Sequence, residues 1–284
     1  MKLRSLLIFA LHAAIVSPIL SAEATQGRLF TSILPQKYLV QRIAGPEFEV
    51  EALVGPGQSP ATYEPGPRTM ARLNEARALF PIGVPFEAAW LPKIRGSMRQ
   101  LRIIDTVEAG AAHVHCEGHD HGEGLDPHLW TSPMEVIGML PAIRDGLSAL
   151  VPQLGTGFAE RARLLEADLL ALDLEIHGLF EGREGRRFMV FHPAWGHFAE
   201  RYGLVQIAIE AEGKEPGARS LAAIIDRARE LGIDTIFVQR QFSSDAAEAV
   251  AKATGAKIVV LDPLAEDYPE NLLRSARLIA EALR

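Results

Sequence analysis

The feature that most constrains the fold of this chain is a long apolar stripe near its middle. Apolar residues between positions 158 and 179 recur at alternating spacings of four and three, which predicts a single amphipathic helix. From Thr156 to Phe180 such a helix spans about 37 Å at 1.5 Å per residue. It is long enough to bridge two lobes, although an ordinary helix packed within one lobe would carry the same stripe. The stripe consists of Phe158, Ala162, Leu165, Leu169, Leu172, Ile176 and Leu179.

Strand and helix signals alternate on both sides of this helix, which predicts parallel sheets. We expect an α/β fold with two lobes (25–150 and 183–284), each a mainly parallel sheet flanked by helices, joined by a long rigid helix at 151–182. The roughly 260 residues that follow the predicted signal peptide are more than a single hydrophobic core usually organises, so two lobes are expected. The predicted strands are 28–33, 48–54, 79–82, 101–104, 188–191, 204–209, 235–239 and 257–261. The predicted helices include 35–44, 68–78, 87–94, 132–150, 195–202, 221–231, 245–254 and 271–283.

Residues 1–24 have the pattern of a secretory signal peptide. Lys2 and Arg4 precede an apolar run at 6–19, and small residues offer cleavage near Ala22 or Ala24. The run is short for a membrane-spanning anchor. We therefore expect an exported, periplasmic protein.

The charge of the chain argues against a nucleic-acid partner. The formal net charge is −7, and removing residues 1–22 takes away Lys2 and Arg4 and no acid, which leaves −9. Nucleic acids attract the opposite sign, whereas a negative surface favours cations. The single cysteine, Cys116, excludes an intramolecular disulfide.

Five of the nine histidines fall between positions 113 and 128. Imidazole is the commonest side-chain ligand of transition metals, and His-x-His spacing lets two rings reach one ion. Glycines and acids around them predict a solvated loop at 108–125, which either captures zinc or is a flexible linker without effect on affinity. The candidate accessory ligands in this loop are His113, His115, Cys116, His119 and His121.

Three further residues stand where a ligand site belongs in an α/β fold. His192 and Asp262 each follow a predicted strand directly, and His128 follows the loop that leaves a strand of the first lobe. Ligands of open α/β sheets bind at the carboxyl ends of strands. Taken singly, each residue is more often a satisfied polar group or a turn cap. Together they predict a metal site in the cleft between the lobes.

Four motifs resemble those of the cluster A-I solute-binding proteins of zinc and manganese ABC importers. The similarity covers nearly the whole chain after residue 31, and its motifs are Asp126-Pro127-His128-Leu129-Trp130, Phe191-His192-Pro193-Ala194-Trp195-Gly196, Gly213-Lys214-Glu215-Pro216, and Asp262-Pro263-Leu264 with Tyr268 and Asn271-Leu272. This resemblance implies two α/β lobes joined by a long helix, with Zn(II) as the transported ligand held by His128, His192 and Asp262. It also implies delivery to an ABC permease in the inner membrane. We expect a monomer, and a periplasmic zinc chaperone as a further partner.

One position departs from the family pattern. The family places its first histidine ligand directly after a Ser-Pro turn, and here Ser59-Pro60 is followed by Ala61. Zinc prefers four ligands, so the fourth would be water, a histidine of the loop, or Glu64.

Other functions remain open at this point. Two imidazoles and a carboxylate also suit manganese or iron(II), within the same family or in an exported metalloenzyme. The chain has no His-Glu-x-x-His, Gly-x-Ser-x-Gly or glycine-rich phosphate loop. We therefore expect no enzyme, and an adhesin or a metal buffer without a transporter is a third class.

Overall fold

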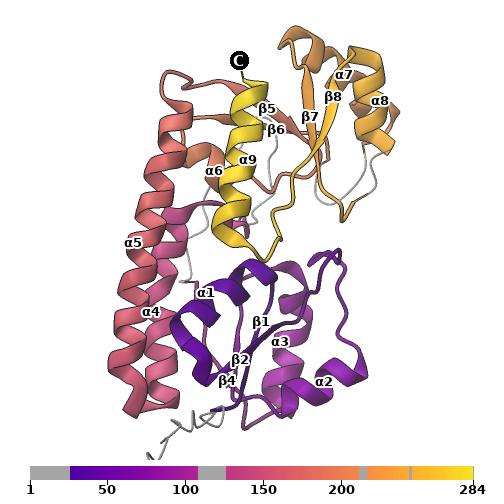
Figure 1. Cartoon of the computed structure of the whole chain (residues 1–284). Helices are drawn as coiled ribbons and strands as arrows, with labels where there is room; N and C mark the ends of the chain where they lie inside the picture. The colour runs from indigo at the N-terminus through magenta and orange to yellow at the C-terminus, as the bar shows by residue number, and fades with distance from the viewer. Residues whose placement is uncertain (1–25, 108–125, 211–215, 243–244, 284) are drawn as a thin grey trace, which may run out of the picture.

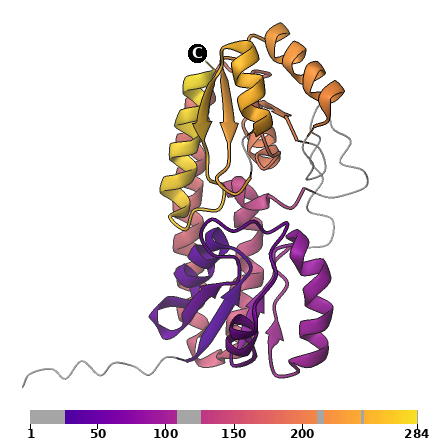
Figure 2. The same cartoon turned by 90° about the vertical axis from the view of Figure 1, so that its right-hand side faces the viewer.

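A computed structural model describes residues 26–107, 126–210, 216–242 and 245–283. The predicted signal peptide, the histidine-rich loop and residues 213–215 of one motif lie outside these ranges. In the described part the α/β class is confirmed. Two four-stranded parallel sheets lie in separate lobes, one above the other, and a long helix runs beside both (Figure 1; Figure 2).

The N-terminal lobe is built on a sheet with the strand order β2-β1-β3-β4, in which every neighbouring pair is parallel. Each of its helices has a proline at the first or second residue, where a main-chain N–H would have no partner within the helix. The strands are β1 (Arg28–Thr31), β2 (Glu49–Ala52), β3 (Ala78–Phe80) and β4 (Arg102–Ile103). The helices are α1 (Leu34–Ala44), α2 (Pro67–Asn74) and α3 (Pro85–Ser97).

Two long helices follow, α4 (Pro133–Leu150) and α5 (Gly155–Phe180). Ser132 begins α4, because its hydroxyl accepts a hydrogen bond from the main-chain N–H of Glu135. The predicted stripe of α5 is buried from Phe158 to Ile176. The helix packs against α4, against α1 of the first lobe and against α9 of the second, so it bridges the lobes (Figure 1).

The C-terminal lobe repeats the architecture with the strand order β6-β5-β7-β8. Its core is formed by apolar residues such as Met189, Val190 and Ile236, which are fully buried. The strands are β5 (Arg187–Val190), β6 (Val205–Ala208), β7 (Thr235–Val238) and β8 (Lys257–Val260). The helices are α6 (Gly196–Arg201), α7 (Ala218–Glu230), α8 (Asp245–Thr254) and α9 (Tyr268–Ala282).

Four predicted helix ends differ from the structure by three or more residues. The helix predicted at 87–94 extends to Ser97, and the helix predicted from Leu221 begins at Ala218. The other two have a local explanation. The helix predicted at 68–78 ends at Asn74, because a turn leads directly into β3. The helix predicted to begin at Asn271 begins at Tyr268, since Pro269 is well suited to a first helical turn. Within the described residues, no helix combines the length and apolarity that crossing a membrane requires.

Candidate metal-binding site

A cavity of about 250 Å³ lies between the lobes. Its wall is formed by segments that follow β2, β3 and β4 in the first lobe and all four strands in the second. The carboxyl ends of both parallel sheets therefore meet at one place, as expected for the ligand site of an α/β fold. The wall includes Ala61, Val84, His128, His192, Glu210 and Leu264.

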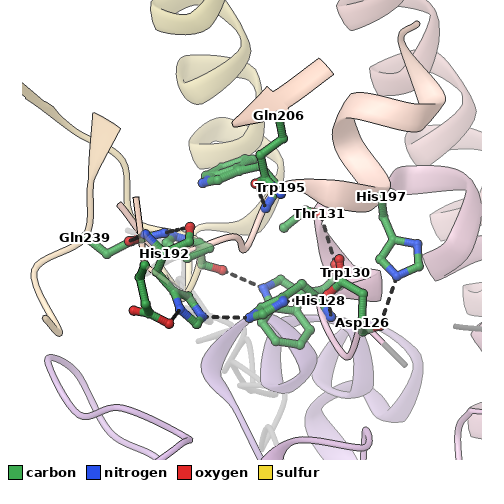
Figure 3. Close-up of polar contacts among 11 residues, drawn as sticks. Asp126, His128, Trp130, Thr131, His192, Trp195, His197, Gln206 and Gln239 are labelled. Carbon is green, nitrogen blue, oxygen red and sulfur yellow. Dashed lines mark hydrogen bonds and ion pairs between the residues drawn. The ribbon is translucent and has the colours of Figure 1, made fainter. Parts of the chain in front are cut away.

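His128 and His192 approach one another from opposite lobes in this cavity (Figure 3). Their Nε2 atoms are 3.3 Å apart, and the rings meet edge to face with centroids 5.2 Å apart. Two nitrogen ligands of one tetrahedral zinc, each bound at 2.0–2.1 Å, stand about 3.3–3.4 Å apart. The two imidazoles therefore have the spacing of neighbouring ligands on one ion.

The orientation of His128 is fixed from within its own loop. Asp126 Oδ1 accepts a hydrogen bond from Nδ1 of His128 at 2.6 Å and from its main-chain N–H at 2.9 Å. Because an ionised carboxylate only accepts, Nδ1 carries the hydrogen and the lone pair lies on Nε2. A buried histidine supports the backbone of this loop, since His197 donates from Nε2 to the main-chain carbonyl of Asp126 at 3.0 Å.

The orientation of His192 is fixed by neighbouring strands. Its Nδ1 lies 2.9 Å from Oε1 of Glu210, a buried residue that follows β6. The side chain of Gln239, which follows β7, accepts from the main-chain N–H of His192 at 3.3 Å and donates to its carbonyl at 3.0 Å. Phe242 stacks on the imidazole with ring centroids 4.4 Å apart. The lone pair of this ring also lies on Nε2, facing that of His128.

The protonation states of these groups suit a cation. Burial lowers the pKa of His192, and the hydrogen bond to Glu210 opposes this only in part, so the neutral imidazole is favoured. Burial raises the pKa of Asp126, but the positive charge of His128 when that ring is protonated, together with its hydrogen bonds, outweighs burial and brings the pKa to about 2. Two facing lone pairs 3.3 Å apart are stabilised only by a proton or a metal ion between them.

Asp262 lies at the edge of the site. Its Oδ1 accepts hydrogen bonds from the side-chain amide of Gln241 and the main-chain N–H of Leu264, both at 3.0 Å. Asn271 donates to its carbonyl at 2.6 Å. Pro263 and Leu264 line the cavity, but Asp262 does not. Over the ranges that the structure describes, no group of three or more histidine, cysteine, aspartate and glutamate side chains is arranged to hold a metal.

The Ser-Pro turn keeps its shape around Ala61. The main-chain N–H of Ala61 donates to the hydroxyl of Ser59 at 3.2 Å, and that of Phe86 donates to the carbonyl of Pro60 at 3.2 Å. Ala61 thus stands at the wall of the cavity, where its methyl group offers no ligand. Glu64 is exposed and does not line the cavity. The candidate accessory ligands His113, His115, Cys116, His119 and His121 lie outside the described residues.

The floor of the cavity contains a hydrogen bond between the lobes. Trp130 precedes α4, and its indole N–H donates to the carbonyl of Pro263 at 2.7 Å. Both residues belong to motifs that suggested metal ligands, although neither residue is itself a ligand. These motifs therefore also hold the two walls of the site together.

Two orienting carboxylates were missed as site residues by sequence reasoning. Asp126 was noted only as part of a motif, and its spacing of two from His128 is the signal of a side chain that turns back on its own loop. Glu210 follows a predicted strand directly, as His192 does. The same rule that selected His192 would have selected Glu210.

Known proteins resemble this chain over almost its whole length. The zinc-binding lipoprotein AdcA of Streptococcus pneumoniae serotype 4 is 30% identical over 281 residues, which is 93% of this chain and 56% of AdcA. This chain therefore spans about half the length of that relative. A crystal structure of ZnuA is 35% identical, with a TM-score of 0.86, over 92% of this chain and 100% of that one. A zinc-bound ZnuA deletion mutant is 36% identical, with a TM-score of 0.84, over 92% and 98% of the two chains.

A family model covers almost the whole described structure, and it extends across both lobes, the bridging helix and the two histidines. It matches residues 29–282 and is described as zinc-uptake complex component A, periplasmic. The resemblance seen in the motifs is confirmed, and the chain belongs to this family of cluster A-I solute-binding proteins.

Proposed function

We propose that this protein captures Zn(II) between its lobes and delivers it to an ABC permease. The observation that carries this proposal is the facing pair of imidazoles, His128 and His192, with Nε2 atoms 3.3 Å apart and with each Nδ1 against a buried carboxylate. Imidazoles backed by carboxylates are the usual arrangement around protein-bound zinc. The zinc-binding relatives support the same cargo.

Asp262 is the proposed third ligand. It follows β8 directly, and its neighbours Pro263 and Leu264 already line the cavity. Its Oδ1 is held by Gln241 and Leu264, so Oδ2 is the proposed ligand atom. The carboxylate would then be oriented by the Gln241 amide as the histidines are oriented by Asp126 and Glu210.

The proposed setting is the periplasm, with cleavage of the leader near Ala22 or Ala24. The family description names a periplasmic component of a zinc-uptake complex, which supports export and a permease partner. We propose a monomer that binds its cargo without turnover, served by a periplasmic zinc chaperone. The histidines at 113–121 are proposed to assist capture.

Metal identity and stoichiometry test this function together. We expect one Zn(II) per chain by competition with a chromophoric chelator, and binding preferred over Mn(II) and Fe(II), because two imidazoles suit zinc better than oxygen-seeking ions. A crystal with zinc should show an anomalous peak between His128 and His192. A peak confined to other histidines would contradict the proposal, and preference for manganese would favour the manganese branch of the same family.

Asp262→Asn tests the third ligand separately. The amide is a poorer donor than the carboxylate, so zinc affinity should fall while the unfolding midpoint of the metal-free protein changes little. Asp267→Asn, which alters an exposed acid a few residues later, is the matched control. Equal affinity of both variants would exclude Asp262 as a ligand and would leave the histidine pair as the site.

A further inference from the structure

The proposed ligands leave one side of the metal open. His128, His192 and Asp262 supply three donors, and a tetrahedral zinc takes four. The remaining side faces a cavity of about 250 Å³, in which a single water requires only about 10–15 Å³. The cleft is therefore much larger than an ion and one water need.

The wall around this space is largely apolar. It includes Ala61, Val84, Pro85, Phe242 and Leu264, while the carboxylates of Asp126 and Glu210 are directed to the histidines. Two further polar side chains, Ser59 and Gln241, also line it, and Gln241 Oε1 is buried with no hydrogen-bond partner among the described residues. An apolar cavity with a few convergent polar groups is the usual form of a site for a small organic molecule.

The charges around the proposed metal position indicate which kind of fourth ligand the site accepts. Two neutral imidazoles add no charge, while Asp126 and Glu210 at their far ends carry two negative charges that match Zn(II). Asp262 would add a third negative charge. A further anionic donor would therefore be disfavoured beside three carboxylates, whereas a neutral nitrogen with a compact apolar body matches both the charge and the wall.

We propose that the cleft binds zinc as a ternary complex with a small nitrogen-donor co-ligand of the imidazole class, seated beside Ala61. Imidazole and small neutral imidazole derivatives have this chemistry. This inference rests on the proposed zinc function and names the form in which the metal is bound. Ala61 is exposed on a turn that is held by the Ser59 hydroxyl and by the hydrogen bond from Phe86 to Pro60. The shape of the cavity beside Ala61 is therefore set by the fold.

Imidazole itself is the probe. At fixed free zinc, millimolar imidazole should tighten zinc binding by about tenfold or more, and zinc should tighten imidazole binding by the same factor, because coupling between two ligands is reciprocal. Ala61→His should bind zinc tightly without imidazole and no longer respond to it. Ala61→Leu is the matched control, since leucine has a similar size and no donor, and it should bind zinc weakly and not respond.

Each outcome has a separate meaning. Wild-type affinity that is independent of imidazole would overturn the inference and leave the zinc function intact, with water or another protein group as the fourth ligand. A response of Ala61→Leu equal to that of the wild type would also overturn it, because the co-ligand would then lie elsewhere. Absence of zinc binding by both the wild type and Ala61→His would instead contradict the proposed function. As a second readout, the visible spectrum of the Co(II)-loaded wild type should change with imidazole, and that of Ala61→Leu should not.

Discussion

The two histidines that face one another across the cleft are held by different kinds of structure. His128 is oriented by Asp126, two residues earlier in the same loop, and that loop is supported by one hydrogen bond from His197. His192 is oriented by Glu210 and Gln239, which come from the neighbouring strands β6 and β7. The wall that carries His128, here called the loop wall, is thus set by local chain geometry. The wall that carries His192, here called the sheet wall, is set by the register of a sheet.

This difference indicates where each wall is vulnerable. The sheet wall depends on two strands whose buried residues also form the lobe core, so its geometry should persist when a single polar contact is lost. The loop wall depends on Asp126 for both the side chain and the main chain of His128. Loss of that carboxylate should therefore disturb position as well as orientation.

The largest expected effect is the loss of either imidazole. His128→Ala and His192→Ala should each weaken zinc binding by more than about 100-fold, the upper range for losing a supporting residue. The two losses of affinity should be similar, because both rings are proposed to bind the same ion. His177→Ala, on the exposed side of α5, is the control and should bind as the wild type does. A much smaller loss for one histidine, measured by chelator competition, would mean that only one lobe holds the metal.

Replacement of the orienting carboxylates should have the next largest effect. Asp126→Asn and Glu210→Gln should each weaken zinc binding by about 10–100-fold, and Asp126→Asn more strongly, because it supports His128 at two atoms. Chelator competition on both variants measures the difference. A larger loss of zinc affinity for Glu210→Gln than for Asp126→Asn would show that the wall carrying His192 is the more sensitive one.

Acid should affect the loop wall through Asp126. Its folded pKa of about 2 lies below the ordinary 3.8, so the folded state binds fewer protons and is favoured above pH 4. This contributes about 2 kcal/mol, which is lost as the pH falls from about 4 to 2. Urea unfolding of the metal-free protein at pH 5 and pH 3 should show this slope, and Asp126→Asn should reduce it. An unchanged slope in the variant would contradict the charge interaction with His128.

The smallest expected effect concerns the bond between the lobes. Trp130→Phe removes the donor to the Pro263 carbonyl and should lower the free energy of unfolding by about 1 kcal/mol. Zinc affinity should change less than for the histidine and carboxylate variants above, since no proposed ligand is replaced. Trp90→Phe, at a half-buried position on α3, controls for the general cost of replacing an indole. Equal stability of the two variants would show that the bond makes no net contribution.

Sequence reasoning was most accurate where a pattern is local and repeated. The four-three stripe predicted α5 to within one residue of its start, and strand-helix alternation predicted both parallel sheets. The rule that ligands lie at strand ends selected His128 and His192, which the structure brings together. It also selected Asp262, whose approach to the pair is still a prediction.

The features that were missed depend on distance in the chain. Glu210 lies 18 residues after His192, and only the pairing of β5 with β6 brings the two side by side. His197 lies in α6, five residues after His192, and supports the opposite wall through Asp126, which no spacing in the sequence indicates. The size and apolar character of the space beside Ala61 likewise arise from segments of both lobes.

The uninterrupted backbone of α5 restricts how far the conformation can change when the metal binds. A continuous ladder of hydrogen bonds over 26 residues resists sharp bending, and the helix contacts both lobes along that length. Empty and filled forms should accordingly differ by a slight rocking rather than a wide swing. A receptor that distinguishes the two forms must therefore respond to small displacements at the rims of both lobes. It can do so only if it contacts both lobes at once over a large surface.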